Sequence, residues 1–302
     1  MTTTQARVIV GVDGSGQALA AVRTAAREAS HRTQPLRIVH AFIWPSLHVD
    51  VGPVAGDLPG TGLRHQAEGV LAEAAAEARG AAPDVPVSTV LIDGSATPVL
   101  LAESRRASLL VLGDRGLGGL SGLLIGSVAV HAAAHAHCPV LVVRGAGPAT
   151  GPVVVGVDGS ETAKLAVGFA FREAEYRRAE LVPVLAVGSR EWGPRERGPS
   201  EDAAVPDPRR TLSESLAGWR TQHPDVVVRP EVVPGHPRHA LVERSAKAQL
   251  VVLGSRGRDT FEGLVRGSVS QALLHHSACP VAVVRATLVP PGPTDPPGDA
   301  PR

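Results

Sequence analysis

The sequence predicts an α/β protein made of two tandem domains of one design, each with a five-stranded parallel sheet and helices on both faces. Two observations support this prediction. The segment VIVGVDGS at 8–15 returns as VVVGVDGS at 153–160, and the segment 113–144 returns at 254–285 without a gap. Within each half, short apolar runs alternate with stretches of helical periodicity, which is typical of parallel strands buried between layers of helices.

The first half contains the elements of one such domain. RVIVGVD at 7–13 is a short apolar run typical of a buried strand, and residues 17–31 carry Leu19, Val22 and Ala26 at helical spacing. The same criteria predict strands at 37–43, 87–93, 108–114 and 139–144, and helices at 64–79, 98–106 and 127–136.

The second half follows the same order. The repeat period is too long for a solenoid and indicates two whole domains. We expect the first domain at 1–146 and the second at 147–287, joined through the small-residue stretch at 145–151 and followed by a disordered Pro-rich tail at 288–302. The strands of the second domain are expected near 152–157, 181–187, 226–233, 249–254 and 280–285.

Composition restricts the class of protein. With 302 residues, 43% hydrophobic and 20% charged, the chain has the length of about two globular domains. A net charge of +1 and an aromatic content of 3% leave little basis for nucleic-acid binding. No apolar run approaches the ~20 residues that span a bilayer, and the N-terminal residues lack the pattern of a secretory signal. We therefore expect a cytoplasmic protein that binds neither nucleic acid nor membrane.

Each half contains one cysteine, Cys138 or Cys279, directly before a proline at the entrance of the last strand. We expect both to be small buried residues in a reducing compartment. The alternative is an intramolecular disulfide or a metal-binding pair.

A glycine spacing that occurs in both halves is the main functional signal. Residues 113–127 and 254–268 share the pattern Gly, two residues, Gly, nine residues, Gly-Ser. Glycine lets the main chain approach a ligand closely, and a helix beginning at the Ser adds unpaired N–H donors and partial positive charge. This combination suits phosphate, so the sequence predicts two anion sites. Tight turns that carry no ligand are the alternative.

An acidic residue accompanies each glycine loop, Asp13 or Asp158 at the end of the first strand of its half. Because the carboxyl ends of parallel strands meet at one edge of the sheet, we expect acid and loop to lie together. A carboxylate repels phosphate, so we expect the acid to face hydroxyls or an exocyclic amine. Neither a Walker A element nor G-x-G-x-x-G is present. An anion cradle beside an acceptor suits a nucleotide.

These segments resemble the universal stress protein family in its ATP-binding branch. The resemblance rests on VIVGVDGS, on the G-x2-G-x9-G-S loop and on the following CPVLVVR, and it covers 7–144 and 152–285. It implies a Rossmann-like domain of the adenine nucleotide alpha-hydrolase type with strand order 3-2-1-4-5. It also implies two ATP sites, with Mg²⁺, in a tandem protein of the kind common in actinobacteria.

The resemblance assigns roles to the motif positions. The acids lie near the adenosine, and backbone at about Ala41 and Ala186 pairs with the adenine edge. The first two motif glycines pass close to ribose and phosphates, and the Gly-Ser helix start holds the phosphates. The predicted cofactor-binding residues are Gly11, Asp13, Ala41, Gly113, Arg115, Gly116, Gly119, Gly126, Ser127 and Val128, then Gly156, Asp158, Ala186, Gly254, Arg256, Gly257, Gly267, Ser268 and Val269.

The two loops differ, which predicts sites of unequal affinity. The first contains Gly118 and Gly119, whereas the second contains Arg258 and Arg266. These arginines either engage phosphate or are solvated.

We expect a nucleotide-sensing regulatory stress-response protein that acts through dimerisation or a regulatory protein partner. No catalytic residue is predicted, because nothing near the motif is an evident general base with a positioned water. At most, slow ATP hydrolysis accompanies binding. The alternatives are an ATPase or nucleotidyl transferase of the adenine nucleotide alpha-hydrolase group, and a module that binds cyclic AMP or no ligand.

The last strands, PVLVVR and PVAVVR, carry a prediction about assembly. In related proteins this strand pairs antiparallel across a dimer axis. Here the two copies are expected to pair within one chain as a pseudo-dimer, which leaves other surfaces for a homodimer.

The remaining signals are weaker. Ser15 and Ser160 precede helices and are expected to cap them. His131 and His135 share a helix face with His137 nearby, and a surface or interface role is favoured over a metal site. The Pro/Gly-rich stretches 44–62 and 188–210 are expected to be variable surface loops, with a lid over the ligand as the alternative.

Overall fold

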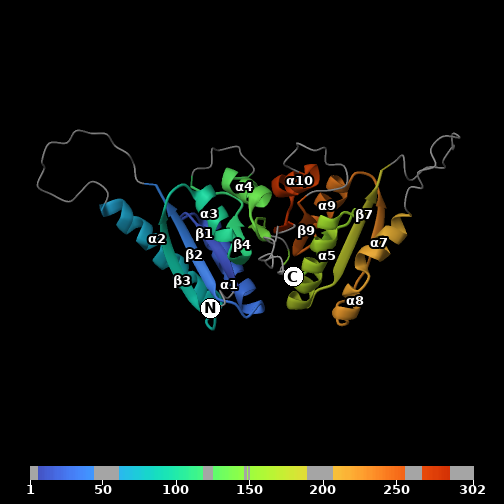
Figure 1. Cartoon of the computed structure of the whole chain (residues 1–302), viewed down its shortest axis with the longest axis horizontal. Helices are drawn as coiled ribbons and strands as arrows, with labels where there is room; N and C mark the ends of the chain where they lie inside the picture. The colour runs from blue at the N-terminus through green and yellow to red at the C-terminus, as the bar shows by residue number, and fades with distance from the viewer. Residues whose placement is uncertain are drawn as a thin grey trace, which may run out of the picture.

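The structure, a computed structural model, describes residues 6–43, 61–117, 125–145, 148, 150–188, 207–255 and 267–285. It contains one ten-stranded sheet with helices on both faces (Figure 1). The first half consists of β1 (Arg7–Val12), α1 (Gly16–His31), β2 (Leu36–Phe42), α2 (Thr61–Ala81), β3 (Val87–Asp93), α3 (Ala96–Ser104), β4 (Ala107–Gly113), α4 (Ser127–His135) and β5 (Val140–Val143).

The second half repeats this order with one change. It consists of β6 (Val153–Gly156), α5 (Glu161–Arg177), β7 (Leu181–Val187), α7 (Pro208–Leu216), α8 (Trp219–Gln222), β8 (Glu231–Pro234), α9 (Pro237–Ser245), β9 (Leu250–Gly254), α10 (Ser268–His276) and β10 (Val281–Val284). Two short helices, α7 and α8, stand where the first half has the single helix α2, because Gly218 interrupts the helix at φ +81°.

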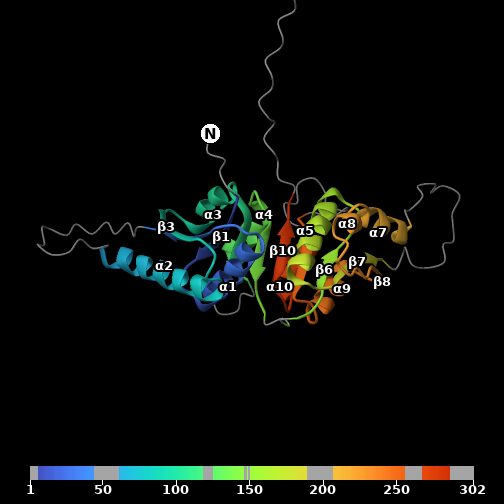
Figure 2. The same ribbon diagram turned by 90° about the horizontal axis from the view of Figure 1, so that it is seen from below.

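The strand order confirms the predicted topology. The sheet runs β3-β2-β1-β4-β5-β10-β9-β6-β7-β8, so each half has the order 3-2-1-4-5 and the halves meet at their last strands. All pairings within a half are parallel, whereas β5 and β10 pair antiparallel. The predicted pairing of the two last strands within one chain is therefore confirmed, and β10 lies near the centre of the molecule (Figure 2).

Both faces of the sheet are covered, which explains the continuous apolar character of the strands. In β1, Val8 and Val10 belong to the core under α1 and α2, while Ile9 belongs to the core under α3 and α4. All three side chains are fully buried. A parallel strand buried on both faces has this composition.

The stretches predicted as long loops are partly helical. Helix α2 begins at Thr61, and α7 begins at Pro208. Proline at the first helical position and the side chain of Asp207, which accepts a hydrogen bond from Arg209 N at 3.0 Å, fix the start of α7. The predicted loops 44–62 and 188–210 are therefore wrong at their C-terminal ends, which are helical. The stretches 44–60 and 189–206 lie outside the described residues, as does the tail predicted from 288.

The third strand of the second half is shorter than predicted. It was expected from residue 226, but β8 begins at Glu231, and only an isolated bridge joins Val228 to Leu181. The turn before it explains the difference, because Val226 N donates to His223 O rather than to a strand partner.

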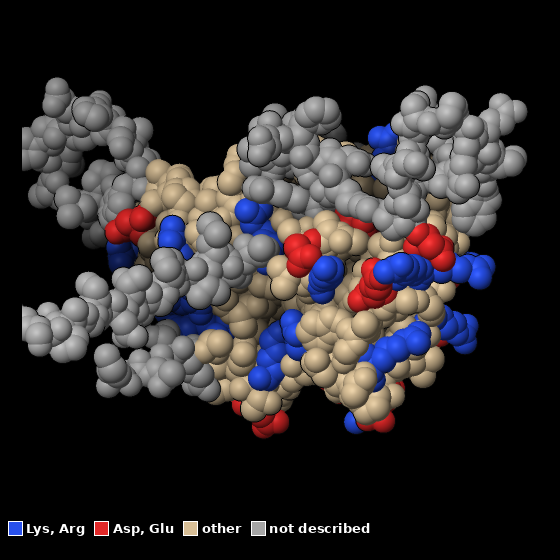
Figure 3. Space-filling view, turned by 45° about the vertical axis from the view of Figure 1, so that its right-hand side comes forward, with Lys and Arg blue, Asp and Glu red and all other residues tan. Residues whose placement is uncertain are grey.

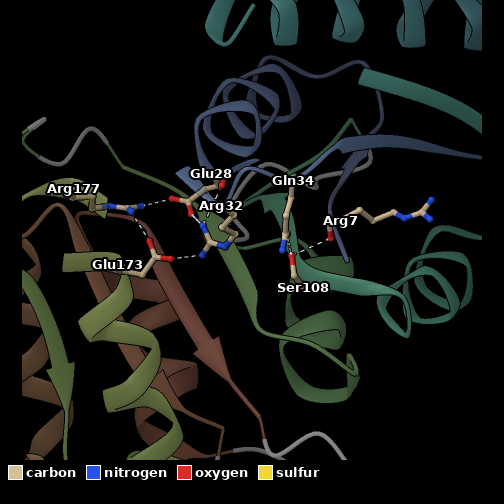
Figure 4. Close-up of polar contacts among 7 residues, drawn as sticks. All are labelled: Arg7, Glu28, Arg32, Gln34, Ser108, Glu173 and Arg177. Atoms are coloured by element: carbon tan, nitrogen blue, oxygen red, sulfur yellow. Dashed lines mark hydrogen bonds and ion pairs between the residues drawn. The ribbon is translucent and has the colours of Figure 1, made fainter. Parts of the chain in front are cut away.

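Four buried charged residues join the two domains beside the central strands (Figure 4). Arg32 on α1 donates to Glu28 on its own helix and to Glu173 on α5. Arg177 on α5 donates in turn to Glu173 and back to Glu28. The four side chains form a closed ring of two positive and two negative charges across the domain interface.

Candidate functional site

Asp13 follows β1 and contacts the first glycine loop. Its Oδ1 accepts a hydrogen bond from Ser15 N at 3.0 Å, and its Oδ2 accepts one from Leu117 N at 2.8 Å. A Cβ on Gly116 would lie 2.1 Å from Oδ2, so only glycine permits this approach. The predicted meeting of acid and loop at one edge of the sheet is thus present. The donors that the structure places on Asp13 are backbone N–H groups, and each carboxylate oxygen retains a second acceptor position.

The second half repeats the first of these two contacts. Asp158 follows β6, and its Oδ1 accepts a hydrogen bond from Ser160 N at 2.9 Å. The serines after both acids cap the next helices, as predicted: Ser15 Oγ accepts from Ala18 N, and Ser160 Oγ accepts from Ala163 N. Helices α1 and α5 therefore each have one first-turn N–H group satisfied by the serine that precedes the helix.

Helices α4 and α10 begin differently, with a glycine as cap. Gly126 precedes α4 with φ −74° and ψ 145°, and Gly267 precedes α10 with φ −66° and ψ 128°. Neither helix start has a capping hydrogen bond from a described side chain. Among the described residues, no side chain caps the first N–H groups of these helices, which come from Ser127 and Val128 or from Ser268 and Val269.

Gly126 is not required by its backbone conformation or by protein packing. Its φ is open to any residue, and a Cβ there would approach Asp114 O at only 3.4 Å, an ordinary contact. Its N–H donates to Asp114 O at 2.7 Å, which ties the start of α4 to the end of β4. The missing side chain leaves space in front of the N-terminus of α4.

Other predicted glycines have packing roles. A Cβ on Gly113 would lie 3.0 Å from backbone atoms of Gln17, and one on Gly254 would lie 2.9 Å from Thr162. Gly11 lies against the core, where a Cβ would lie 2.8 Å from Leu112. Gly156 occupies the equivalent position in the second half, where a Cβ would lie 2.9 Å from the side chain of Leu253. These four glycines let strands and helices approach closely.

The remaining predicted residues lie near the same edge or outside the described part. Ala41 and Ala186 occupy matching positions near the carboxyl ends of β2 and β7. Arg115 is exposed, with its Nε 4.0 Å from the Asp114 carboxylate. Three predicted residues lie outside the described residues: Gly119, Arg256 and Gly257. The two arginines of the second loop, Arg258 and Arg266, also lie outside them.

The histidines of α4 make local contacts. His131 Nδ1 donates to Ser127 O at 2.9 Å, and His135 Nδ1 donates to His131 O at 3.1 Å. Within the described part of the chain, no group of three or more His, Cys, Asp or Glu side chains is arranged to hold a metal. The helix-surface interpretation of His131 and His135 agrees with their exposure.

The two cysteines are free and buried, as predicted. Burial raises the pKa of Cys138 to about 12 and that of Cys279 to about 11. Both thiols therefore remain protonated and poorly nucleophilic near neutral pH.

Two features were not predicted. The first is the charged ring at the domain interface, whose signal in the sequence is the Glu-x3-Arg spacing of Glu28 and Arg32, which returns at Glu173 and Arg177. The second is a cavity of about 710 Å³ in the second domain between α7, α8 and β8, lined by residues that include Arg209, Leu212, Leu216, Arg220 and Val232.

Charge on the second domain is mixed. Figure 3 shows basic and acidic side chains interspersed over this face. Exposed pairs such as Lys164–Glu161 and Arg210–Glu214, each at 2.7 Å, belong to this pattern. Among the described helices, none is long and apolar enough to cross a membrane.

Fold and site together define a tandem α/β protein in which each half has an acid after its first strand and a glycine-capped helix after its fourth. Residues 6–144 and 150–285 each match the model of the universal stress protein family. The chain therefore belongs to the universal stress protein family, as two tandem domains.

Whole-chain relatives agree with this assignment. A universal stress protein of Mycobacterium tuberculosis strain H37Rv is 36% identical over 292 residues, covering 93% of this chain and 97% of the relative. One of Mycolicibacterium smegmatis is 35% identical over 297 residues, covering 94% and 98%. The crystal structure of a universal stress protein from Archaeoglobus fulgidus shares the fold, with a TM-score of 0.68, 19% identity, and coverage of 94% of this chain and 98% of that one.

Proposed function

We propose that each domain binds one ATP molecule, with Mg²⁺, and that the chain is a nucleotide-sensing regulatory stress-response protein. In this proposal the phosphates occupy the N-termini of α4 and α10, and the adenosine lies toward Asp13 or Asp158. The observation that carries the proposal is that α4 and α10 begin with a glycine cap, which in the first domain accompanies an acid-bound loop, whereas serines cap α1 and α5 of the same domains.

Physical chemistry supports phosphate as the group at α4 and α10. The free N–H groups and the positive end of the helix dipole favour an anion. Gly126 leaves room there that the protein's own packing does not need. Asp13 has remaining acceptor capacity for ribose hydroxyls or the adenine amine, which suits a nucleoside attached to that anion.

We propose binding rather than rapid turnover. A general base needs a free acceptor within reach of a water. Asp13, the acid at this edge of the first domain, accepts two backbone N–H groups, and in this proposal its remaining acceptor positions face the nucleoside rather than a water at the phosphates. Its contacts suit a residue that fixes the loop.

We also propose a homodimer, or a complex with a regulatory protein, in the cytoplasm. Since β5 and β10 already pair within the chain, a second copy must use another surface than the last strand.

The test is calorimetric titration with ATP of the wild-type chain and of Gly126→Ala and Gly267→Ala variants. The φ and ψ angles at both positions are open to alanine, and a Cβ at Gly126 would meet only Asp114 O, at 3.4 Å, and Arg115 Cα, at 3.7 Å, among the described residues, so we expect a methyl group before each helix without loss of the fold. We expect two sites in the wild type and one in each variant. Gly16→Ala is the matched control, since a Cβ there meets nothing within 4 Å.

A wild-type chain that gives no heat with ATP up to millimolar concentration, and that carries no nucleotide on purification, would contradict the proposal. Competition by cyclic AMP and AMP decides the preferred nucleotide. Phosphate release well above about one turnover per minute would favour the ATPase alternative.

A further inference from the structure

Each domain ends in an arginine that reaches into the other domain. Arg144 follows β5, and its Nη1 donates to Leu273 O at 3.1 Å and to Leu274 O at 2.6 Å. These carbonyls lie in the last turn of α10. At the matching position of the repeat, Arg285 follows β10, and its Nη1 donates to Ala134 O in the last turn of α4. Each domain thus provides an arginine that binds the last turn of a helix in the other domain.

The two helices reached in this way are those whose N-termini form the candidate phosphate sites. Each has only nine residues, a length that is marginal for an isolated helix. Each begins with a glycine that supplies no capping side chain. The last-turn contact from the opposite domain therefore adds a restraint on each helix to its core packing and, for α4, to the bond from Gly126 N to Asp114 O at its other end.

The position of Arg144 has an energetic cost, which indicates that its contacts matter. Its Nε is buried without a hydrogen-bond partner among the described residues. Burial lowers the pKa of the Arg144 guanidinium, an effect that the charge of Asp114 opposes. Asp114 lies at the end of β4, and its carbonyl holds Gly126 N at the start of α4. Arg144 thus lies between the glycine loop of one domain and the helix of the other.

We propose that Arg144 and Arg285 are positioning residues for nucleotide binding, each acting on the site of the opposite domain. A guanidinium at a helix C-terminus satisfies the last carbonyls and complements the helix dipole. It thereby holds the N–H groups at the other end in fixed register for phosphate, which raises affinity through preorganisation. Each domain thus contributes a positioning residue to the site of the other across the antiparallel β5–β10 junction. This inference rests on the proposed function.

The experiment measures ATP affinity one site at a time. The Gly126→Ala background reports the second-domain site, and the Gly267→Ala background reports the first-domain site. We expect Arg144→Met to weaken ATP binding at the second-domain site by about 3- to 10-fold and to change the first-domain site by less than about 2-fold. Arg285→Met should show the opposite pattern. Arg144→Lys should restore most of the affinity, since it keeps the positive charge at the end of α10.

Equal weakening of both sites by Arg144→Met, or no weakening of either, would overturn the inference. Amide hydrogen exchange measured without nucleotide distinguishes failure of this inference from failure of the proposed function. If the wild-type chain binds no ATP, Arg144→Met should still accelerate exchange in α10 more than in α4. If exchange in both helices is unchanged, the positioning role itself is wrong.

Discussion

Arg32 of the first domain donates to the carboxylate of Glu173 of the second, and Arg177 of the second domain donates to the carboxylate of Glu28 of the first. Glu28 and Glu173 are 2% and 1% exposed. Burial alone would raise the pKa of Glu28, but the charges of Arg177 and Arg32 and their hydrogen bonds together lower it. Arg32 also lies over the rings of Phe169 and Tyr176, at 5.7 and 5.4 Å from their centroids. The domain interface therefore depends on the charges being complete.

Arg32→Met should destabilise the protein strongly. It leaves Glu28 and Glu173 buried with one guanidinium between them, and breaking a buried pair costs about 3–5 kcal/mol. Urea unfolding should show this loss in the free energy of unfolding. The control is Arg210→Met, because the Arg210–Glu214 pair has side chains 73% and 62% exposed and solvent screening leaves it little effect on stability.

A loss for Arg32→Met no larger than for Arg210→Met would show that the ring is not a determinant of stability. Replacing all four ring residues with apolar side chains of similar volume is a further test. Such replacements are often neutral or stabilising, since the desolvation penalty is removed with the charges. The fourfold variant should therefore be more stable than Arg32→Met.

The buried thiols should make stability fall at alkaline pH. The pKa of Cys138 is raised to about 12 and that of Cys279 to about 11, whereas an unfolded cysteine titrates near about 8.5. Above that pH the unfolded chain releases protons that the native chain retains. The free energy of unfolding should then fall by up to about 1.4 kcal/mol per pH unit for each thiol.

Denaturant unfolding between about pH 8 and pH 11 checks this prediction. The matched control is the Cys138→Ala/Cys279→Ala variant, in which this part of the slope should disappear. An identical slope in the variant and the wild type would assign the alkaline loss to other groups.

The repeat made the fold predictable from the sequence. Apolar strands and duplicated motifs indicated both halves of the sheet, and the resemblance to proteins whose last strand pairs antiparallel across a dimer axis indicated the β5–β10 pairing. The charged ring was not predictable in the same way. A Glu–Arg pair at i, i+4, such as Glu28 and Arg32, reads as an exposed helix pair, and its burial depends on a partner helix far away in the sequence.

The candidate site was predictable in part. The meeting of Asp13 with the loop near Gly116 follows from parallel topology. The packing roles of Gly11 and Gly113 do not, because glycine in a motif gives the same signal whether a ligand or a neighbouring helix requires the space. The two explanations, ligand contact and packing, are separated only by the short distances that an added Cβ would make from Gly113 to Gln17 and from Gly11 to Leu112.

Gly113→Ala should destabilise the protein in the absence of any nucleotide. The added Cβ would lie 3.0 Å from the backbone of Gln17, in the first turn of α1, and backbone cannot move as a side chain does. Overpacking of this kind costs about 1–3 kcal/mol. Gly16→Ala is the control and should be neutral or stabilising by about 0.4–1 kcal/mol. Thermal unfolding of both variants checks this prediction. Equal unfolding midpoints for Gly113→Ala and Gly16→Ala would contradict it.

Gly168 and Trp219 should show strong energetic coupling in the second domain. Gly168 lies in the middle of α5, where alanine is ordinarily favoured by about 1 kcal/mol. A Cβ there would lie 2.3 Å from Trp219 Cζ2, and Trp219 stacks with Phe171 at 6.3 Å between centroids. Gly168→Ala should therefore destabilise the wild type by about 1–3 kcal/mol.

In a Trp219→Leu background the same change should become stabilising, because the clash is removed and the gain in helix propensity remains. A double-mutant cycle by urea unfolding measures this reversal of sign as an interaction energy between the two positions. If Gly168→Ala had the same effect in both backgrounds, the glycine would be explained by something other than the indole ring. A reversal would establish that Trp219, at the start of α8, is the reason why α5 carries a glycine at its centre.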